Sequence, residues 1–225
     1  MWTLLATGAL GAVLGARHAF EPDHLAAVST LVSDRPRPRH AAALGALWGL
    51  GHTAALLAVG LTLVATRTTL APAAERGFEL AVAAMLVVLG VRSVIQAVRD
   101  GRRGQVHAHT HGDRTHVHPG PRSHVHVWTR TIAVRPLVVG LIHGLAGSGG
   151  MAALAMAEMS TTSAAALYVL LFGVGSTVGM AAASAGAAAS MTHLTVGAPA
   201  ARRVRIGAGV LAVAVGLAWG ALAIA

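Results

Sequence analysis

The sequence predicts an all-α polytopic membrane protein, with six transmembrane helices arranged as two inverted three-helix repeats. Of the 225 residues, 55% are apolar and only 11% are charged, and the mean hydropathy is +0.65. Because an unpaired backbone amide is costly in lipid, long apolar stretches of this kind must be helices rather than open strands. The alternation of period two that marks a membrane barrel is missing, so a barrel is not expected.

Six stretches are long and apolar enough to cross a hydrocarbon core of about 30 Å, which takes about 20 helical residues. The first stretch is over-long for one crossing and contains Pro22. The expected spans are approximately residues 2–32, 41–65, 78–98, 136–158, 163–190 and 204–224.

The distribution of basic residues predicts the orientation. All of them are arginines, and most lie in the first, third and fifth connections between spans. By the positive-inside rule, both termini face outward and the long third connection is cytoplasmic. The apolar run before Arg17 has no basic leader, so we expect it to stay in the mature chain. These features predict an integral protein of the cytoplasmic membrane.

Charge and cysteine content exclude several classes of protein. The net charge of +9 comes from arginines gathered in the connections, which does not indicate a nucleic-acid-binding surface. Cysteine is absent, so disulfides, thiolate metal sites and a cysteine nucleophile are excluded.

An internal repeat divides the chain. Residues 47–53 (LWGLGHT) align with residues 171–177 (LFGVGST), and His18 aligns with His143 at nearly the same offset. Each half holds three spans, an odd number, so the two halves would insert in opposite senses, as in many transporters. The predicted division is a first repeat at 1–98, a linker at 99–135 and a second repeat at 136–225.

The first span contains a cluster of ionisable residues, RHAFEPDH at 17–24. Such groups inside a membrane are costly and usually functional. In an unbroken helix, Asp23 would lie about 140° and His24 about 240° around from His18, so the three could not face one point. Pro22 lacks an N–H and collides with the carbonyl four residues back, which belongs to His18. We therefore expect a break in the helix that brings the three side chains toward one cavity.

Two imidazoles with a carboxylate suit nickel, cobalt or zinc. His52 lies in the middle of the second span, and His143 holds in the second repeat the place of His18 in the first. We predict His18, Asp23, His24 and His52 as metal ligands, with His143 as a weaker candidate on the opposite wall.

Other roles for these residues are open. Asp23 could orient an imidazole instead of binding the ion itself. Arg17 could pair with Glu21 or Asp23, leaving His18 as a packed residue. We expect Glu158 and His193, at the ends of their spans, to be solvated or interfacial.

The motif RHAFEPDHL at 17–25 resembles the His-x4-Asp-His signature of the nickel/cobalt transporter family, and LGHT at 50–53 is similar to its Gly-His-Ser element. The resemblance implies proton-linked or otherwise driven movement of Ni2+ or Co2+ across the membrane, by a protein that is not an enzyme and holds no resident cofactor. Protonation of His18 or His24 would compete with the metal, so transport should depend on pH.

Two departures from the family pattern leave the direction of transport open. The usual Asp-Ala-Asp is Glu21-Pro22-Asp23 here, which is closer to nickel/cobalt exporters. The segment HGLAG at 143–147 resembles short urease-accessory or hydrogenase-linked permeases.

The linker is rich in histidine, arginine, glycine and proline. Its imidazoles cannot build a core, so we expect it to be disordered without metal and to act as a cytoplasmic metal buffer or sensor. A basic linker that contacts anionic lipid is the alternative, and a cytoplasmic metallochaperone is a candidate partner. The histidines are His107, His109, His111, His116, His118, His124 and His126.

Three rival functions have weaker support. An intramembrane metalloenzyme is disfavoured because the His-Glu-x-x-His motif is absent. A haem-binding cytochrome has no specific signal. An exporter of anions or sulfur compounds with the same helix count would not need Asp23 to face its substrate.

Overall fold

The computed structural model describes residues 2–32, 37–102, 107–111, 114–118, 134–159, 161–194 and 198–225. Within these ranges the chain forms seven helices and one two-stranded hairpin, so the predicted all-helical membrane fold is confirmed in its main feature. The elements are α1 (Trp2–His18), α2 (Pro22–Val32), α3 (Pro38–Thr66), α4 (Pro72–Arg102), β1 (His107–His111), β2 (Arg114–His118), α5 (Val134–Glu158), α6 (Thr162–Leu194) and α7 (Ala198–Ile224).

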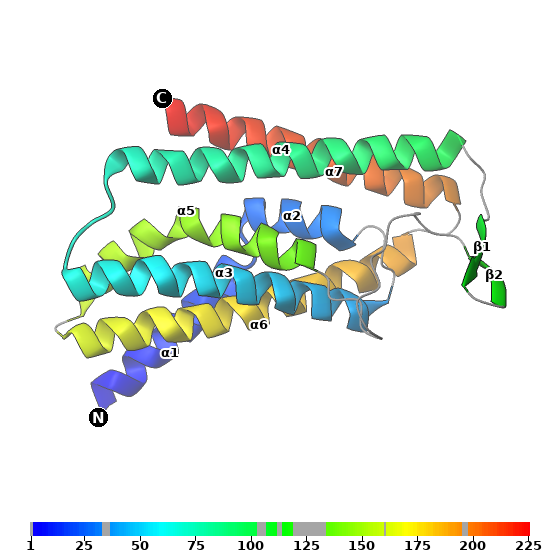
Figure 1. The fold of residues 1–225 in the computed structure, drawn as a ribbon. Coiled ribbons are helices and arrows are strands. Elements are labelled where there is room, and N and C mark those ends of the chain that lie inside the picture. Colours follow the sequence, from blue (N-terminus) through cyan, green and yellow to red (C-terminus); the bar gives the residue numbers. More distant parts are fainter. Residues whose placement is uncertain are drawn as a thin grey trace.

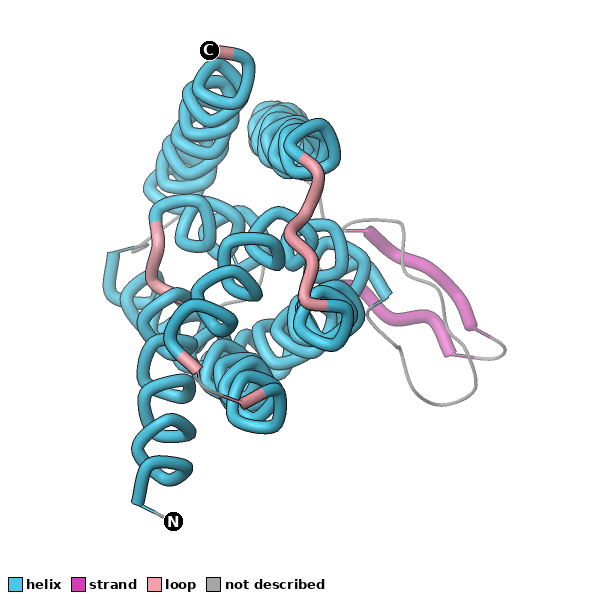
Figure 2. Tube along the Cα trace, turned by 90° about the vertical axis from the view of Figure 1, so that its left-hand side faces the viewer, coloured by secondary structure: helices cyan, strands magenta, loops and turns pink. Residues whose placement is uncertain are grey.

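The long helices run side by side (Figure 1). The helices α3 and α6 pack against each other, α1 packs on α6, and α5 packs on α3. The helices α4 and α7 form a second layer and make most of their contacts with each other. Viewed at 90°, the C-terminal end of α7 lies far from the N-terminus of α1, and the hairpin stands beside the bundle (Figure 2).

Four of the described helices are long and apolar enough to cross a membrane: residues 38–66, 72–99, 162–191 and 199–224. The first predicted span, 2–32, is instead two helices of 17 and 11 residues, because Pro22 starts a new helix. The predicted span 136–158 lies in the 25-residue helix α5, and Val134–Gly147 is a shorter apolar helix among the residues whose side chains are described. The six-span arrangement therefore stays a prediction.

The ends of α3 follow from local chemistry. Pro38 stands in its first turn, where a missing N–H leaves no hydrogen bond unmade. At the other end, Arg67 takes the left-handed conformation (φ 52°), and its N–H bonds the carbonyl of Leu63. This turn gives a carbonyl in the last turn of α3 a hydrogen-bond donor, and the chain then continues to α4.

Glycines let the backbones of neighbouring helices approach closely. A Cβ added at Gly15 would collide with the backbone of Phe172, and one added at Gly140 would collide with the carbonyl of Trp48. In lipid the hydrophobic effect does not drive helices together. Close packing of this kind is therefore one of the main forces that hold them in contact.

A polar link between α3 and α6 lies in this tightly packed region. The Thr53 hydroxyl donates to the carbonyl of Gly173 at 2.7 Å and lies 2.9 Å from the hydroxyl of Thr177. The contact between the hydroxyls of Thr53 and Thr177 joins two residues that the internal repeat aligns with each other.

The histidine-rich linker was expected to be disordered, but part of it forms a hairpin. Residues 107–111 and 114–118 pair as an antiparallel hairpin in which His107 lies opposite His118 and His109 opposite His116. In this part of the chain, histidines alternate with alanine, threonine and valine, and a period of two with β-branched residues suits paired strands. Residues 124 and 126 lie outside the described residues.

Candidate metal site

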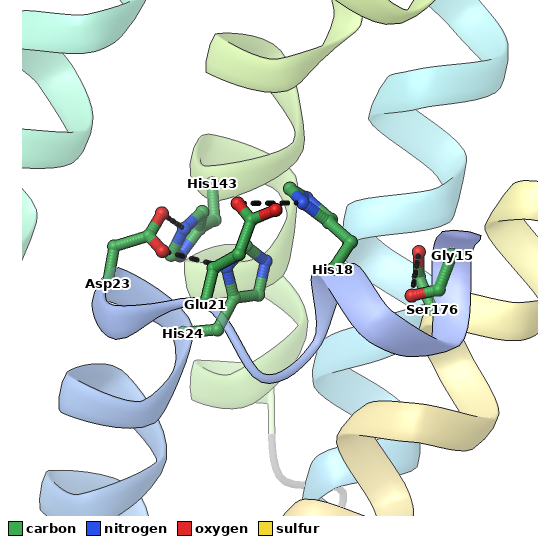
Figure 3. Close-up of polar contacts among 7 residues, drawn as sticks. All are labelled: Gly15, His18, Glu21, Asp23, His24, His143 and Ser176. Carbon is green, nitrogen blue, oxygen red and sulfur yellow. Dashed lines mark hydrogen bonds and ion pairs between the residues drawn. The ribbon is translucent and has the colours of Figure 1, made fainter. Parts of the chain in front are cut away.

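The candidate site begins at the break between α1 and α2, which the sequence predicted. The N–H of Phe20 bonds the carbonyl of Arg17 at 2.9 Å, and the N–H of Glu21 bonds the carbonyl of His18 at 3.0 Å. Pro22 opens α2, where its missing donor leaves no bond unmade. These bonds hold the turn, and His24 in the first turn of α2 lies beside His18 at the end of α1, with their ring centroids 4.4 Å apart (Figure 3).

All five residues that the sequence singled out come together. His18 ends α1, Asp23 and His24 stand in the first turn of α2, His52 lies in α3, and His143 lies in α5. The cluster thus draws on four helices. His24, His52 and His143 are almost completely buried and Asp23 is buried, whereas the side chain of His18 remains 17% exposed.

Asp23 joins two imidazoles. One carboxylate oxygen, Oδ1, lies 3.1 Å from Nδ1 of His24, and the other, Oδ2, lies 2.8 Å from Nε2 of His143. Each bond takes up one nitrogen of its ring and orients the ring. The carboxylate also stands at the start of α2, where the helix dipole favours negative charge.

His24 is at the centre of the cluster. Its ring centroid lies 4.4 Å from that of His18, 4.1 Å from that of His143 and 5.3 Å from that of His52. The rings of His52 and His143, by contrast, are 6.0 Å apart.

Several buried nitrogens in this cluster have no hydrogen-bond partner. They are Nε2 of His24, both ring nitrogens of His52, and Nδ1 of His143. A buried polar group without a partner normally costs stability, so such a concentration calls for an explanation. Neutral imidazole nitrogens with free lone pairs are the ligands that nickel, cobalt and zinc accept.

The distances fit a metal ion at two overlapping places. In one group, His18, His24 and His52 each offer a ligand atom, and these atoms lie within 4.8 Å of one another. In the other, Asp23, His24 and His143 do the same. Such spacing lets modest side-chain movements bring three ligands onto one ion.

The alternative pairing of Arg17 is not what the described side chains adopt. Glu21 pairs with His18, its Oε2 lying 3.0 Å from Nδ1, and Asp23 pairs with the two buried imidazoles. Arg17 itself is exposed.

Two residues near the cluster were not among the predicted site residues. The half-exposed Glu21 holds Nδ1 of His18, and its position three residues after that histidine was the available signal. Trp48 is fully buried, with its ring centroid 5.4 Å from that of His24 and 5.7 Å from that of His143. It precedes His52 by four residues and so shares a helix face with it.

The side chains of Glu158, His193 and the hairpin histidines lie outside the described part of the structure. The predicted interfacial positions of Glu158 and His193 stay predictions.

Helices of membrane-spanning length around a buried group of imidazoles and a carboxylate define an integral membrane protein with a candidate transition-metal site. Comparison with known families agrees with this class. The family described as NicO, high-affinity nickel-transport protein, matches residues 4–220, and the chain belongs to it. The predicted resemblance to nickel/cobalt transporters is thereby confirmed at the level of the family.

Two relatives extend the comparison. The urease accessory protein UreH of Bacillus sp. (strain TB-90) is 34% identical over 177 residues, covering 79% of this chain and 74% of the relative. The chloroplast protein FOR GROWTH AND FERTILITY 2 of Arabidopsis thaliana is 27% identical over 180 residues, covering 80% of this chain but 44% of that protein. No solved structure matches the chain.

Proposed function

We propose that this protein carries Ni2+, Co2+ or both across the cytoplasmic membrane, and that His18, Asp23, His24, His52 and His143 bind the ion in transit. Membership in a nickel-transport family supports the substrate class. The observation that carries the proposal is the convergence of these five side chains inside the bundle, with several imidazole nitrogens unpartnered.

The chemistry of the cluster suits a borderline divalent cation. Neutral imidazoles replace part of the hydration shell, while the carboxylate of Asp23 offsets part of the positive charge in a medium of low polarity. Nearby apolar walls, including Trp48, keep bulk water away from most of the ligands.

We also propose that the helices form two inverted repeats that rock against each other around the cluster. Matching contacts support this. Gly15 approaches Phe172 as Gly140 approaches Trp48, and these are residues that the sequence repeat aligns. In such a six-span arrangement, α1 and α2 together form one interrupted transmembrane span, and α5 forms another.

The proposed orientation places both termini outside and the linker in the cytoplasm. The arginine-rich connections support it through the positive-inside rule. The α3–α4 and α5–α6 connections lie together at one end of the bundle, and the hairpin lies at the other (Figure 1).

We propose that the linker buffers metal beside the pathway and can receive it from, or pass it to, a metallochaperone. The hairpin register supports this role, because it pairs His107 with His118 and His109 with His116 across the two strands.

Export is the second candidate for direction, favoured by the Glu21-Pro22 pair, which resembles exporters. The experiment that decides both substrate and direction is flux of radioactive Ni2+, with Co2+ and Zn2+ as competitors, in liposomes that hold the purified protein in known orientation. His18→Ala and His24→Ala should each abolish flux, while His40→Ala, an exposed histidine in the first turn of α3, should not. Unchanged flux in either cluster variant would contradict the proposal, and sulfur-compound or anion flux without metal flux would favour the exporter of anions.

A further inference from the structure

The two three-residue groups share a single residue. His18, His24 and His52 form an outer group, and Asp23, His24 and His143 form an inner group, so His24 belongs to both. Two divalent cations held a few ångströms apart repel each other strongly in a medium of low polarity. One ion at a time can therefore use the cluster, at one place or the other.

The two nitrogens of His24 have different surroundings. Its Nδ1 faces Oδ1 of Asp23 at 3.1 Å, whereas its Nε2 is buried without a partner. The ring therefore presents one nitrogen to the inner carboxylate and keeps the other uncommitted. This arrangement suits a residue that serves two neighbouring positions in turn.

The exposed fraction of the side chains falls from Glu21, which pairs with His18, through His18 to His143. The Glu21 side chain is 49% exposed, that of His18 is 17% exposed, and that of His143 is only 2% exposed. Of the two groups, only the outer one holds a partly exposed ligand, so an ion from water meets His18 first.

The ligand chemistry differs as well. The outer group offers three imidazoles, and the inner group offers two imidazoles with a carboxylate. A neutral first position followed by an anionic second one favours inward movement of a cation once water has been removed.

We infer that the cluster holds the metal at two successive positions, an outer one made by His18, His24 and His52 and an inner one made by Asp23, His24 and His143, and that His24 passes the ion between them. This inference rests on the proposed function. It predicts that binding and transport separate: either position alone can hold an ion, but passage needs both.

The test uses the full-length protein and Ni2+ alone, with binding measured by titration calorimetry in detergent and flux measured in liposomes. His18→Ala and His143→Ala should each lose flux at least tenfold. At least one of them should keep its dissociation constant within about threefold of the unmodified protein, because one position survives.

The double variant H18A/H143A damages both positions and should bind at least 100-fold more weakly, far beyond the product of the two single losses. His24→Ala should behave like the double variant. His40→Ala serves as the matched control, and circular dichroism of each variant confirms that it is folded.

The outcomes are distinct. A loss in the double variant equal to the product of the single losses would overturn the two-position inference and leave a single site with five ligands. Near-normal flux in either single variant would also overturn it. An unmodified protein that neither binds nor moves Ni2+ would instead contradict the proposed function itself.

Discussion

Asp23 and His143 are 120 residues apart in the sequence, yet Oδ2 of Asp23 lies 2.8 Å from Nε2 of His143 in the buried centre of the bundle. The same carboxylate holds His24 through its other oxygen. One acidic side chain thus joins α2 to α5 and orients an imidazole on each.

Asp23→Asn should lower Ni2+ flux by about 10- to 100-fold, the usual effect of losing a group that binds or orients metal ligands. The amide keeps the size but loses the charge, and it has one acceptor oxygen where the carboxylate has two. Flux in liposomes measures the effect. Glu75→Gln removes a carboxylate from the first turn of α4, outside the cluster, and should leave flux unchanged. Equal flux in D23N and the unmodified protein would remove Asp23 from the site.

Glu21→Ala should raise the KM for Ni2+ about tenfold while changing the maximal rate little. Its carboxylate fixes Nδ1 of His18 and so leaves Nε2 of that ring for the metal. Glu21→Gln retains an acceptor oxygen and should recover much of the affinity. Concentration-dependent flux separates the two parameters, and an equal effect of the alanine and glutamine variants would mean that charge alone matters.

Gly144 and Gly147 offer a matched pair of substitutions on α5. A Cβ at Gly144 would collide with the carbonyl of His52, whereas one at Gly147 would meet Nε2 of His18 at an ordinary 3.8 Å. Gly144→Ala should therefore destabilise the protein by about 1–3 kcal/mol through overpacking. Gly147→Ala should not. Thermal unfolding in detergent compares them, and similar melting temperatures would argue against the close approach of α3 and α5.

The hydroxyl contact between Thr53 and Thr177 should appear as a coupling energy. Thr53→Val, Thr177→Val and the double variant define a thermodynamic cycle, for which membrane proteins give about 0.6 kcal/mol on average. Unfolding in mixed micelles supplies the free energies. A cycle that closes without coupling would mean that the 2.9 Å contact adds nothing to stability.

Deleting residues 105–127 should change the apparent affinity for Ni2+, or its regulation, while leaving residual transport. The cluster between the helices does not include these residues, so the pathway itself should persist. Replacement by a glycine-serine linker of equal length controls for the connection. Complete loss of transport with the replaced linker would place the linker in the pathway.

Local chemistry was sufficient to predict where the first helix breaks. Pro22 removes one donor and disturbs the carbonyl of His18, and the structure starts a new helix at that residue. The convergence of His18, Asp23 and His24 followed from the same reasoning. His143 entered through the repeat, because it aligns with His18 in the other half.

Other features needed packing that the sequence does not specify. Which nitrogens Asp23 holds depends on the relative rotation of α2 and α5, and the pairing of Glu21 with His18 depends on the turn between α1 and α2. The hairpin in the linker went unpredicted because a polar, histidine-rich composition outweighed its short alternation of period two.

The short helix α2 carries Asp23 and His24 next to each other, whereas His18, His52 and His143 stand on three other helices. A small tilt of those 11 residues would draw both side chains away together. Since His24 is common to the two groups of ligands, each group would lose a member in the same motion. A rearrangement of this one short helix is therefore enough to take apart both groups of ligands.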